Sequence, residues 1–297
     1  MSAATHIKAP QDKSVAIRRA TAADAEICGK ICFDAFGSLA TFHNFPQDFP
    51  SPAVPLGLLS WMFAHPAFYC VVAEQDGKII GSNCLDERTP IAGVGPITVD
   101  PAVQNHSAGR QLMLAVMERS AERNFAGIRL VQAGYHNRSL ALYAKLGFVV
   151  REPLACLQGP ALKKTPAGYN VRPATVNDVA ACNDLCLRVH GHDRGGELPD
   201  GIQQGSAVVA ESDGRLRAYA SGIGFFGHAV GVTNHDLIAL LSASSQFSGP
   251  GILVPSRNAA LFRWCLENGL RVVQTMTLMS KGLYNEPAGA FLPSVLF

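Results

Sequence analysis

The residues best suited to chemistry lie between positions 97 and 117, in the stretch ITVDPAVQNHSAGRQLMLAVM. A β-branched run gives way to small and polar residues at 104–109 and then to an amphipathic helix. Such a junction leaves the first N–H groups of the helix unpaired and directs the positive end of its dipole at the loop. Ser107, Ala108 and Gly109 are small enough to let a phosphate reach the backbone. The spacing therefore predicts an anion site at the start of this helix.

The composition limits the kind of protein that carries this site. The chain has 297 residues, a length typical of roughly two domains with sizeable cores. Its 25 Lys and Arg residues nearly balance 23 Asp and Glu residues, which predicts no nucleic-acid partner and no membrane partner. No apolar run approaches the length of a membrane span, about 20 residues, and residues 1–14 lack the apolar core of a secretory signal. We expect a soluble, cytoplasmic protein.

The cysteines and histidines predict no metal site. Eight Cys residues occur without a CxxC pair, which favours reduced, mostly buried thiols over disulfides. The sequence HGHD at 190–193 has no second cluster to complete a ligand set. It is more typical of a glycine-containing loop after a helix.

An internal repeat organises the elements around the predicted anion site. Three segments of the first half recur in the same order in the second half. The first predicts a strand and a helix with a Thr N-cap and an Asp three residues later, the second a hairpin around an Asp-Gly turn, and the third a helix ending at Gly. The paired segments are residues 15–33 and 169–187, 71–79 and 208–216, and 137–148 and 258–270.

The repeat predicts a duplicated α/β module, residues 15–158 and 169–297, joined by a linker that contains Pro, Gly and Lys. The offset between the copies falls from 154 to 137 and then to 121 residues, so the second copy has lost chain on both sides of the hairpin. The second loss covers the anion loop, and Asp236 stands near the start of the next helix, where a carboxylate would repel a phosphate. We therefore expect a degenerate second module without an anion site.

With these motifs the chain resembles the GCN5-related N-acetyltransferase (GNAT) family, here as a tandem of two modules. The acetyl-CoA loop of that family reads Q/RxxGxG/A, and this sequence has QNHSAG at 104–109. The family's next signature is an Asn followed by a Tyr on the helix before a Gly-aromatic strand start, which NRSLALYAKLGF at 137–148 matches. The resemblance implies an α/β fold of the α+β type, in which each module is a mixed, mostly antiparallel twisted sheet flanked by helices.

The resemblance also implies acetyl-CoA as the cosubstrate. Backbone groups around Thr98 and Val99 would bind the pantetheine arm, beside Asn137 and Tyr143. The pyrophosphate would be bound by the N–H groups of the loop residues Gln104, Asn105, His106, Ser107, Ala108, Gly109 and Arg110. Ser107 replaces the first Gly of the family loop, and we expect the fold to tolerate this departure unless the position requires a positive φ.

The implied activity is direct transfer of the acetyl group to a small-molecule primary amine. A base must then take the amine proton, and an acid must protect the leaving thiolate. Tyr143 resembles the family's thiolate-facing acid. The alternative is that Tyr143 is an ordinary packed aromatic beside Leu140.

The base is not apparent, because the strand position where many relatives carry a Glu has no ionisable residue here. The nearest candidates are Asp86, Glu87 and His43, each of which could equally be a solvated charge or a satisfied polar contact. A water chain to solvent is a further alternative. The segment 42–63 is rich in Phe, Pro and Trp and would wall the acceptor site in this family, although core packing explains the same residues.

A second function class stays open, a non-catalytic acyl-CoA-binding or regulatory protein with the same fold. We expect a monomer or homodimer that binds one CoA per chain. The second module would either form one wall of the acceptor pocket or only stabilise the first module. The apolar C-terminal end, GAFLPSVLF, should dock against the body of the protein.

Overall fold

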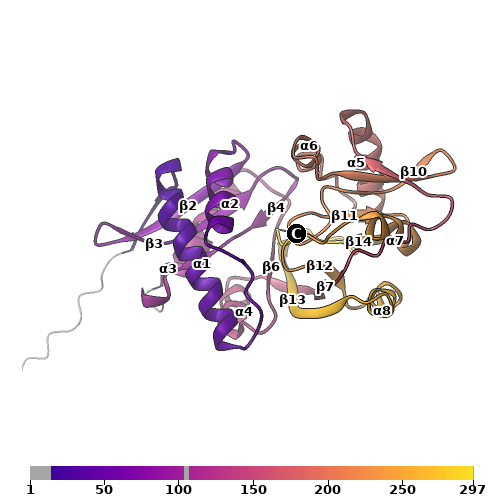
Figure 1. The fold of residues 1–297 in the computed structure, drawn as a ribbon. Helices are drawn as coiled ribbons and strands as arrows, with labels where there is room; N and C mark the ends of the chain where they lie inside the picture. The colour runs from indigo at the N-terminus through magenta and orange to yellow at the C-terminus, as the bar shows by residue number, and fades with distance from the viewer. Residues whose placement is uncertain (1–14, 104–106, 297) are drawn as a thin grey trace, which may run out of the picture.

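The computed structural model describes residues 15–103 and 107–296 (Figure 1). Short 3-10 turns occur at Ala22–Asp24, Pro101–Val103 and Val176–Asp178. The first half contains β1 (Ala16–Arg19), α1 (Ala25–Phe42), α2 (Ala53–Ala64), β2 (Phe68–Gln75), β3 (Lys78–Asp86), β4 (Ile91–Val94), β5 (Thr98–Val99), α3 (Ala108–Glu122), β6 (Gly127–Ala133), α4 (Asn137–Lys145) and β7 (Val149–Gln158). The second half contains β8 (Asn170–Pro173), α5 (Val179–His190), α6 (Leu198–Gln203), β9 (Val208–Ser212), β10 (Arg215–Ala220), β11 (Ala229–Gly231), α7 (Asn234–Ala243), β12 (Ile252–Pro255), α8 (Ala259–Glu267), β13 (Arg271–Gly282) and β14 (Ala290–Leu292).

The first-half sheet is covered by helices on both faces. Strands β1, β2, β3 and β4 pair antiparallel in that order, and β4 pairs parallel with β6. Along β2, Val71 and Ala73 pack in the cluster that contains α3, whereas Cys70 and Val72 pack with α1 and α2. Alternate residues of a strand face opposite sides of the sheet, so the helices lie on opposite faces.

The second half repeats this arrangement on a smaller scale. Its sheet runs β14-β11-β10-β9-β8. On β10, Tyr219 packs with α5 and α6, and its neighbour Ala218 packs with α7 and α8. The fold prediction is therefore confirmed as an α+β arrangement of two related modules with mostly antiparallel sheets.

The repeated segments form the predicted local structures. Both starting helices have a capping box, in which the Oδ2 of Asp24 accepts from Thr21 N at 2.7 Å and the Oδ2 of Asp178 accepts from Thr175 N at 2.7 Å. Both hairpins turn at Asp-Gly pairs in the left-handed region, as type I′ turns require, at residues 76–77 and 213–214.

Strand pairing crosses between the halves at the centre of the large sheet. β13 of the second half lies between β6 and β7 of the first half, and β7 pairs on its other edge with β12 (Figure 1). The expected boundary at residues 158–169 falls in the link from β7 to β8. Each half therefore contributes a strand to the pairing of the other, an exchange that the repeat did not predict.

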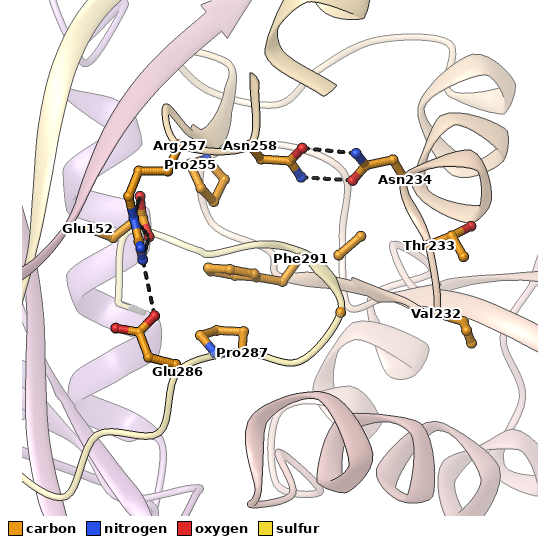
Figure 2. A pocket seen from close by; sticks show the side chains of 12 residues that line it. Glu152, Val232, Thr233, Asn234, Pro255, Arg257, Asn258, Glu286, Pro287 and Phe291 are labelled. Carbon is orange, nitrogen blue, oxygen red and sulfur yellow. Dashed lines mark hydrogen bonds and ion pairs between the residues drawn. The ribbon is translucent and has the colours of Figure 1, made fainter. Parts of the chain in front are cut away.

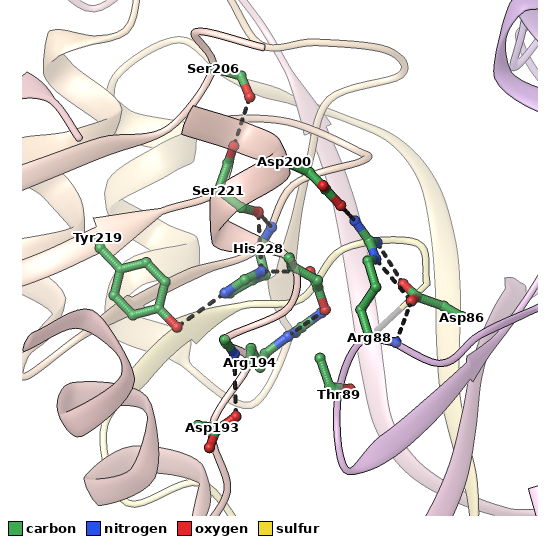
Figure 3. A network of polar contacts seen from close by, with 12 residues as sticks. Asp86, Arg88, Thr89, Asp193, Arg194, Asp200, Ser206, Tyr219, Ser221 and His228 are labelled. Atoms are coloured by element: carbon green, nitrogen blue, oxygen red, sulfur yellow. Dashed lines mark hydrogen bonds and ion pairs between the residues drawn. The ribbon is translucent and has the colours of Figure 1, made fainter. Parts of the chain in front are cut away.

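A buried polar network also joins the halves. Arg88 of the first half binds both Asp86 at 2.5 Å and Asp200 of the second half at 2.7 Å (Figure 3). A Cβ at Gly196 would lie 2.1 Å from the Arg88 carbonyl oxygen, so only glycine allows this approach of the two backbones. Farther into the second half, Glu197 accepts from Arg194 and from His228 Nδ1, the latter at 2.9 Å.

Candidate active site

A cavity of about 860 Å³ opens where β4 and β6 diverge. The parallel pairing of these strands ends at Gly93 and Arg129, and β5 pairs instead with β3 on the other side. Val94 and Leu130 line the opening between the separated strands. Diverging strands leave backbone N–H and C=O groups without sheet partners, so an extended ligand can pair with them.

The start of α3 forms one end of this cavity. Ser107, Ala108, Gly109 and Arg110 all line it. Gln104, Asn105 and His106 of the expected loop lie outside the described residues. The described part of the loop thus brings the first turn of a helix, with its unpaired N–H groups, to the cavity.

Ser107 adopts a positive φ, the conformation that disfavours a serine in place of the family's glycine. Its φ is 61° and its ψ is −5°, in the left-handed region. A non-glycine residue there costs about 1–2 kcal/mol, so the expectation of a tolerable replacement holds only at that cost. The side chain of Gln111 donates to Ser107 Oγ at 3.0 Å, which fixes the serine hydroxyl beside the loop.

The strand and helix residues expected beside the loop line the same cavity: Thr98, Val99, Asn137 and Tyr143. The Thr98 hydroxyl is buried without a hydrogen-bond partner among the described residues. Gln132 on β6, which the sequence analysis missed, is 6% exposed and also lines the cavity. Neither polar atom of its side-chain amide has a partner in the described part of the chain, so the cavity presents buried polar groups to a ligand.

Tyr143 is buried on α4 at the cavity wall. Burial raises the pKa of its phenol to about 12, and this effect outweighs a hydrogen bond with Ser139 that lowers the pKa. The phenol therefore carries its proton at neutral pH. Ser139 Oγ lies 2.6 Å from His136 Nδ1, and burial lowers the pKa of His136, so a neutral imidazole ends this chain of contacts.

The candidate bases Asp86 and Glu87 lie away from the cavity, in ion pairs. Asp86 binds Arg88, and Glu87 accepts from Arg119 Nε at 2.6 Å. Neither carboxylate lines the cavity, whereas His43 does. Guanidinium groups therefore occupy both acids outside the cavity.

The segment 42–63 reaches the cavity together with residues of the second half. Phe49 and Met62 line it from the first half, and Phe225, Met276 and Leu296 line it from the second. The C-terminal end docks here as expected, since Val295 N donates to Phe225 O at 2.8 Å. The second half therefore forms part of the cavity wall.

The corresponding position of the second half holds a smaller pocket, about 440 Å³, at the starts of α7 and α8 (Figure 2). β14 pairs with β11 and contacts β12, so it fills the space between the two strands. Thr233 N-caps α7, and Asp236 completes the capping box with a buried carboxylate that accepts from Thr233 N at 2.7 Å. Asn234 and Asn258 hydrogen-bond each other in both directions, which closes the helix starts (Figure 2).

Comparison with known proteins agrees with this geometry. Residues 38–148 match the model of the acetyltransferase (GNAT) family. This segment of the chain is therefore similar to a GNAT acetyltransferase domain. The matched segment runs from the second half of α1 to the end of α4 and contains the cavity loop, Asn137 and Tyr143.

Two relatives of known name match a shorter stretch of this chain. A mycothiol acetyltransferase of Amycolatopsis mediterranei (strain U-32) is 34% identical over 90 residues, which cover 27% of this chain and 30% of that protein. A mycothiol acetyltransferase of Nocardia farcinica (strain IFM 10152) is 28% identical over 93 residues, 30% of this chain and 31% of that protein. The chain thus spans about a third of the length of these relatives.

Among solved structures, a putative acetyltransferase from Pyrococcus horikoshii covers 94% of this chain and 93% of its own, with a TM-score of 0.72 and 19% identity. A tandem GNAT protein from the clavulanic acid biosynthesis pathway covers 91% and 98%, with a TM-score of 0.55 and 15% identity. These likenesses confirm the fold. No helix in the described ranges combines the length and the apolarity needed to cross a membrane.

Proposed function

We propose that the protein is an acetyl-CoA-dependent N-acetyltransferase that acts on a small-molecule primary amine by direct transfer. The observation that carries the proposal is the cavity at the β4–β6 divergence, where the start of α3, the unpartnered Thr98 and Gln132 side chains, and Tyr143 meet. This donor set fits acetyl-CoA, because a helix start suits a pyrophosphate and an extended arm with amides suits diverging strands.

Each residue would have a separate task. The N–H groups of Ala108, Gly109 and Arg110 would bind phosphate oxygens at the positive end of α3. Thr98, Val99, Gln132 and Asn137 would hold the pantetheine arm against the sheet. Acetyl-CoA supplies an activated acyl group, and the apolar cavity wall keeps water from competing with the amine.

Tyr143 would protect the leaving sulfur. Its raised pKa keeps the phenol protonated at neutral pH, so it can donate to a thiolate. The contact with Ser139, and from there with His136, would hold the phenol in one orientation.

The second module would bind no CoA of its own. Support comes from β14, which fills the space between β11 and β12, and from Asp236, whose charge occupies the start of α7. A titration of the whole chain with acetyl-CoA should therefore give one site per chain. Two sites per chain would contradict the degeneracy of residues 169–297.

Thiol release from acetyl-CoA across a panel of amines, amino acids, polyamines and aminoglycosides tests the activity. We expect saturable, amine-dependent release for at least one small primary amine. Tight acetyl-CoA binding without release for any amine would favour a binding or regulatory protein instead.

A further inference from the structure

We infer that Asp48, held by Gln274 of the second half, is the carboxylate that binds the ammonium group of the acceptor and takes its proton. The inference rests on the proposed function and names a general base, which that proposal does not assign. Asp48 lies in the connection between α1 and α2 and lines the cavity. The site is therefore completed only by contacts between the two halves.

The carboxylate is held in place by a chain of neutral groups. Gln274 Nε2 donates to Asp48 Oδ1 at 3.0 Å, and Tyr135 Oη donates to Gln274 Oε1 at 3.2 Å. Tyr135 is itself stacked on Phe45, with ring centroids 4.0 Å apart and planes 8° apart. Since both ends of the Gln274 amide are engaged, the amide nitrogen must point at Asp48.

No ion pair to Asp48 occurs in the described ranges of the chain. His43 lines the same cavity and contacts the Tyr135 ring, with centroids 5.2 Å apart. Burial and the charge of Asp48 raise the pKa values of Cys32 on α1, Tyr135, and Cys156 on β7, and all three groups are neutral at pH 7. Burial raises the pKa of Asp48, which brings a carboxylate closer to the range of a useful base.

A half-buried carboxylate without a counter-ion is costly unless a ligand supplies the positive charge. An alkylammonium group would do so at Asp48. The cavity that Asp48 lines is largely apolar, and Phe49 and Met62 from one half and Phe225 and Met276 from the other are among its lining residues. A free amino acid would place its own carboxylate in this apolar space, and a polyamine would bury a second ammonium group there.

The chemistry therefore specifies a primary amine carried on an apolar body. The two arginines that line the cavity, Arg110 and Arg138, lie in the first turns of α3 and α4.

The proton balance is complete with the groups present. Asp48 takes one proton from the ammonium, and the free amine nitrogen forms the C–N bond to the acetyl carbon as the C–S bond breaks. Tyr143 donates its proton to the sulfur. The nitrogen, now bonded to the acetyl carbon, then loses one of its two remaining protons, and this proton restores the phenol of Tyr143. Asp48 then returns its proton to solvent, so each turnover releases one acetamide, one thiol and one proton.

The test compares Asp48→Asn with Asp213→Asn, which makes the same chemical change at an exposed hairpin turn. With phenethylamine as acceptor at pH 7, we expect Asp48→Asn to lose about 100-fold in kcat/KM for the amine. The loss should shrink at pH values where the amine is deprotonated by solvent, and the acetyl-CoA Kd should stay unchanged. Asp213→Asn should behave as the wild type.

Gln274→Met keeps the side-chain length and removes the hydrogen bond. It should lower kcat/KM for the amine about 10-fold and displace the pH profile, whereas a purely structural role would leave the profile in place. Full activity of Asp48→Asn, or preference of the wild type for spermidine or glutamate over phenethylamine, would overturn the inference and leave the proposed function standing. A wild type that neither binds acetyl-CoA nor releases thiol would instead refute the proposed function.

Discussion

At the scale of single residues, Tyr143 separates catalysis from binding. Tyr143→Phe keeps the ring in its buried position and removes only the hydroxyl that would donate to the sulfur. We expect kcat to fall by about 100-fold, with the acetyl-CoA Kd unchanged by calorimetry. Equal turnover of the two proteins would return Tyr143 to the class of packed aromatics.

Ser107 offers a second residue-scale prediction, because it carries the strain of a left-handed φ. Ser107→Gly removes the steric cost and should keep acetyl-CoA binding, with a change in stability of no more than about 1 kcal/mol. Ser107→Val adds a branched Cβ to the same conformation, so it should destabilise the loop by about 1–2 kcal/mol and weaken acetyl-CoA binding. Urea unfolding and calorimetry on both variants check this, and a Val variant with wild-type affinity would count against the loop as the anion site.

The residues of the site differ in how far the sequence predicts them. Ser107 and Tyr143 belong to short local motifs, so their spacing alone brings them to attention. Gln132 lies in a strand with no motif around it. Asp48 and Gln274 are 226 positions apart, and only the pairing of β13 beside β6 brings them together. A single sequence carries no signal for such a contact.

At the scale of elements, local signals fixed the helices and hairpins but not the partners of β7. The Asp-Gly turns and capping boxes are determined by neighbouring residues, so both copies of each could be predicted. The partner of a strand depends on distant chain. The strand β7 pairs only with β13 and β12, both from the second half, within the described pairing.

This pairing predicts the fate of a fragment that ends at residue 160. Without β13, the strand β6 loses one neighbour, and β7 loses both. We expect the fragment to expose open strand edges, to associate during gel filtration, and to lack a cooperative thermal transition. A monomeric fragment that unfolds cooperatively and binds acetyl-CoA with the affinity of the whole chain would contradict this expectation. The full-length protein purified in parallel is the control.

At the scale of the whole molecule, the buried histidines of the second half couple stability to pH. Burial lowers the pKa of His192 and of His228 to about 4, against 6.5 for the free side chain. Between these values the unfolded chain binds more protons than the folded chain, so stability falls as the pH drops from about 6.5 to 4. Burial favours the neutral form of His228, although its contact with Glu197 at 2.9 Å raises the pKa, and Nε2 lies 3.1 Å from the Tyr219 hydroxyl (Figure 3).

Urea unfolding at a series of pH values between 4 and 7 measures this slope. His228→Gln should unfold more easily at pH 7 but lose less stability between pH 6.5 and 4 than the wild type, since one titrating group is gone. His235→Gln, at an exposed position, should leave the slope unchanged. A His228→Gln slope equal to that of the wild type would show that another group dominates the acid sensitivity.

The exchange of β7 and β13 also bears on how the protein is made. On the ribosome the chain emerges from its N-terminus, and β6 and β7 leave the exit tunnel without the strand that separates them in the finished sheet. About 120 further residues must be synthesised before β13 is available, which takes on the order of ten seconds at ordinary rates of translation. During that interval the nascent first half has an incomplete sheet, and its strand edges stay exposed until β13 has been synthesised. Slower codons in the second half would prolong this exposure. A chaperone that covers strand edges would reduce the association of nascent chains through them.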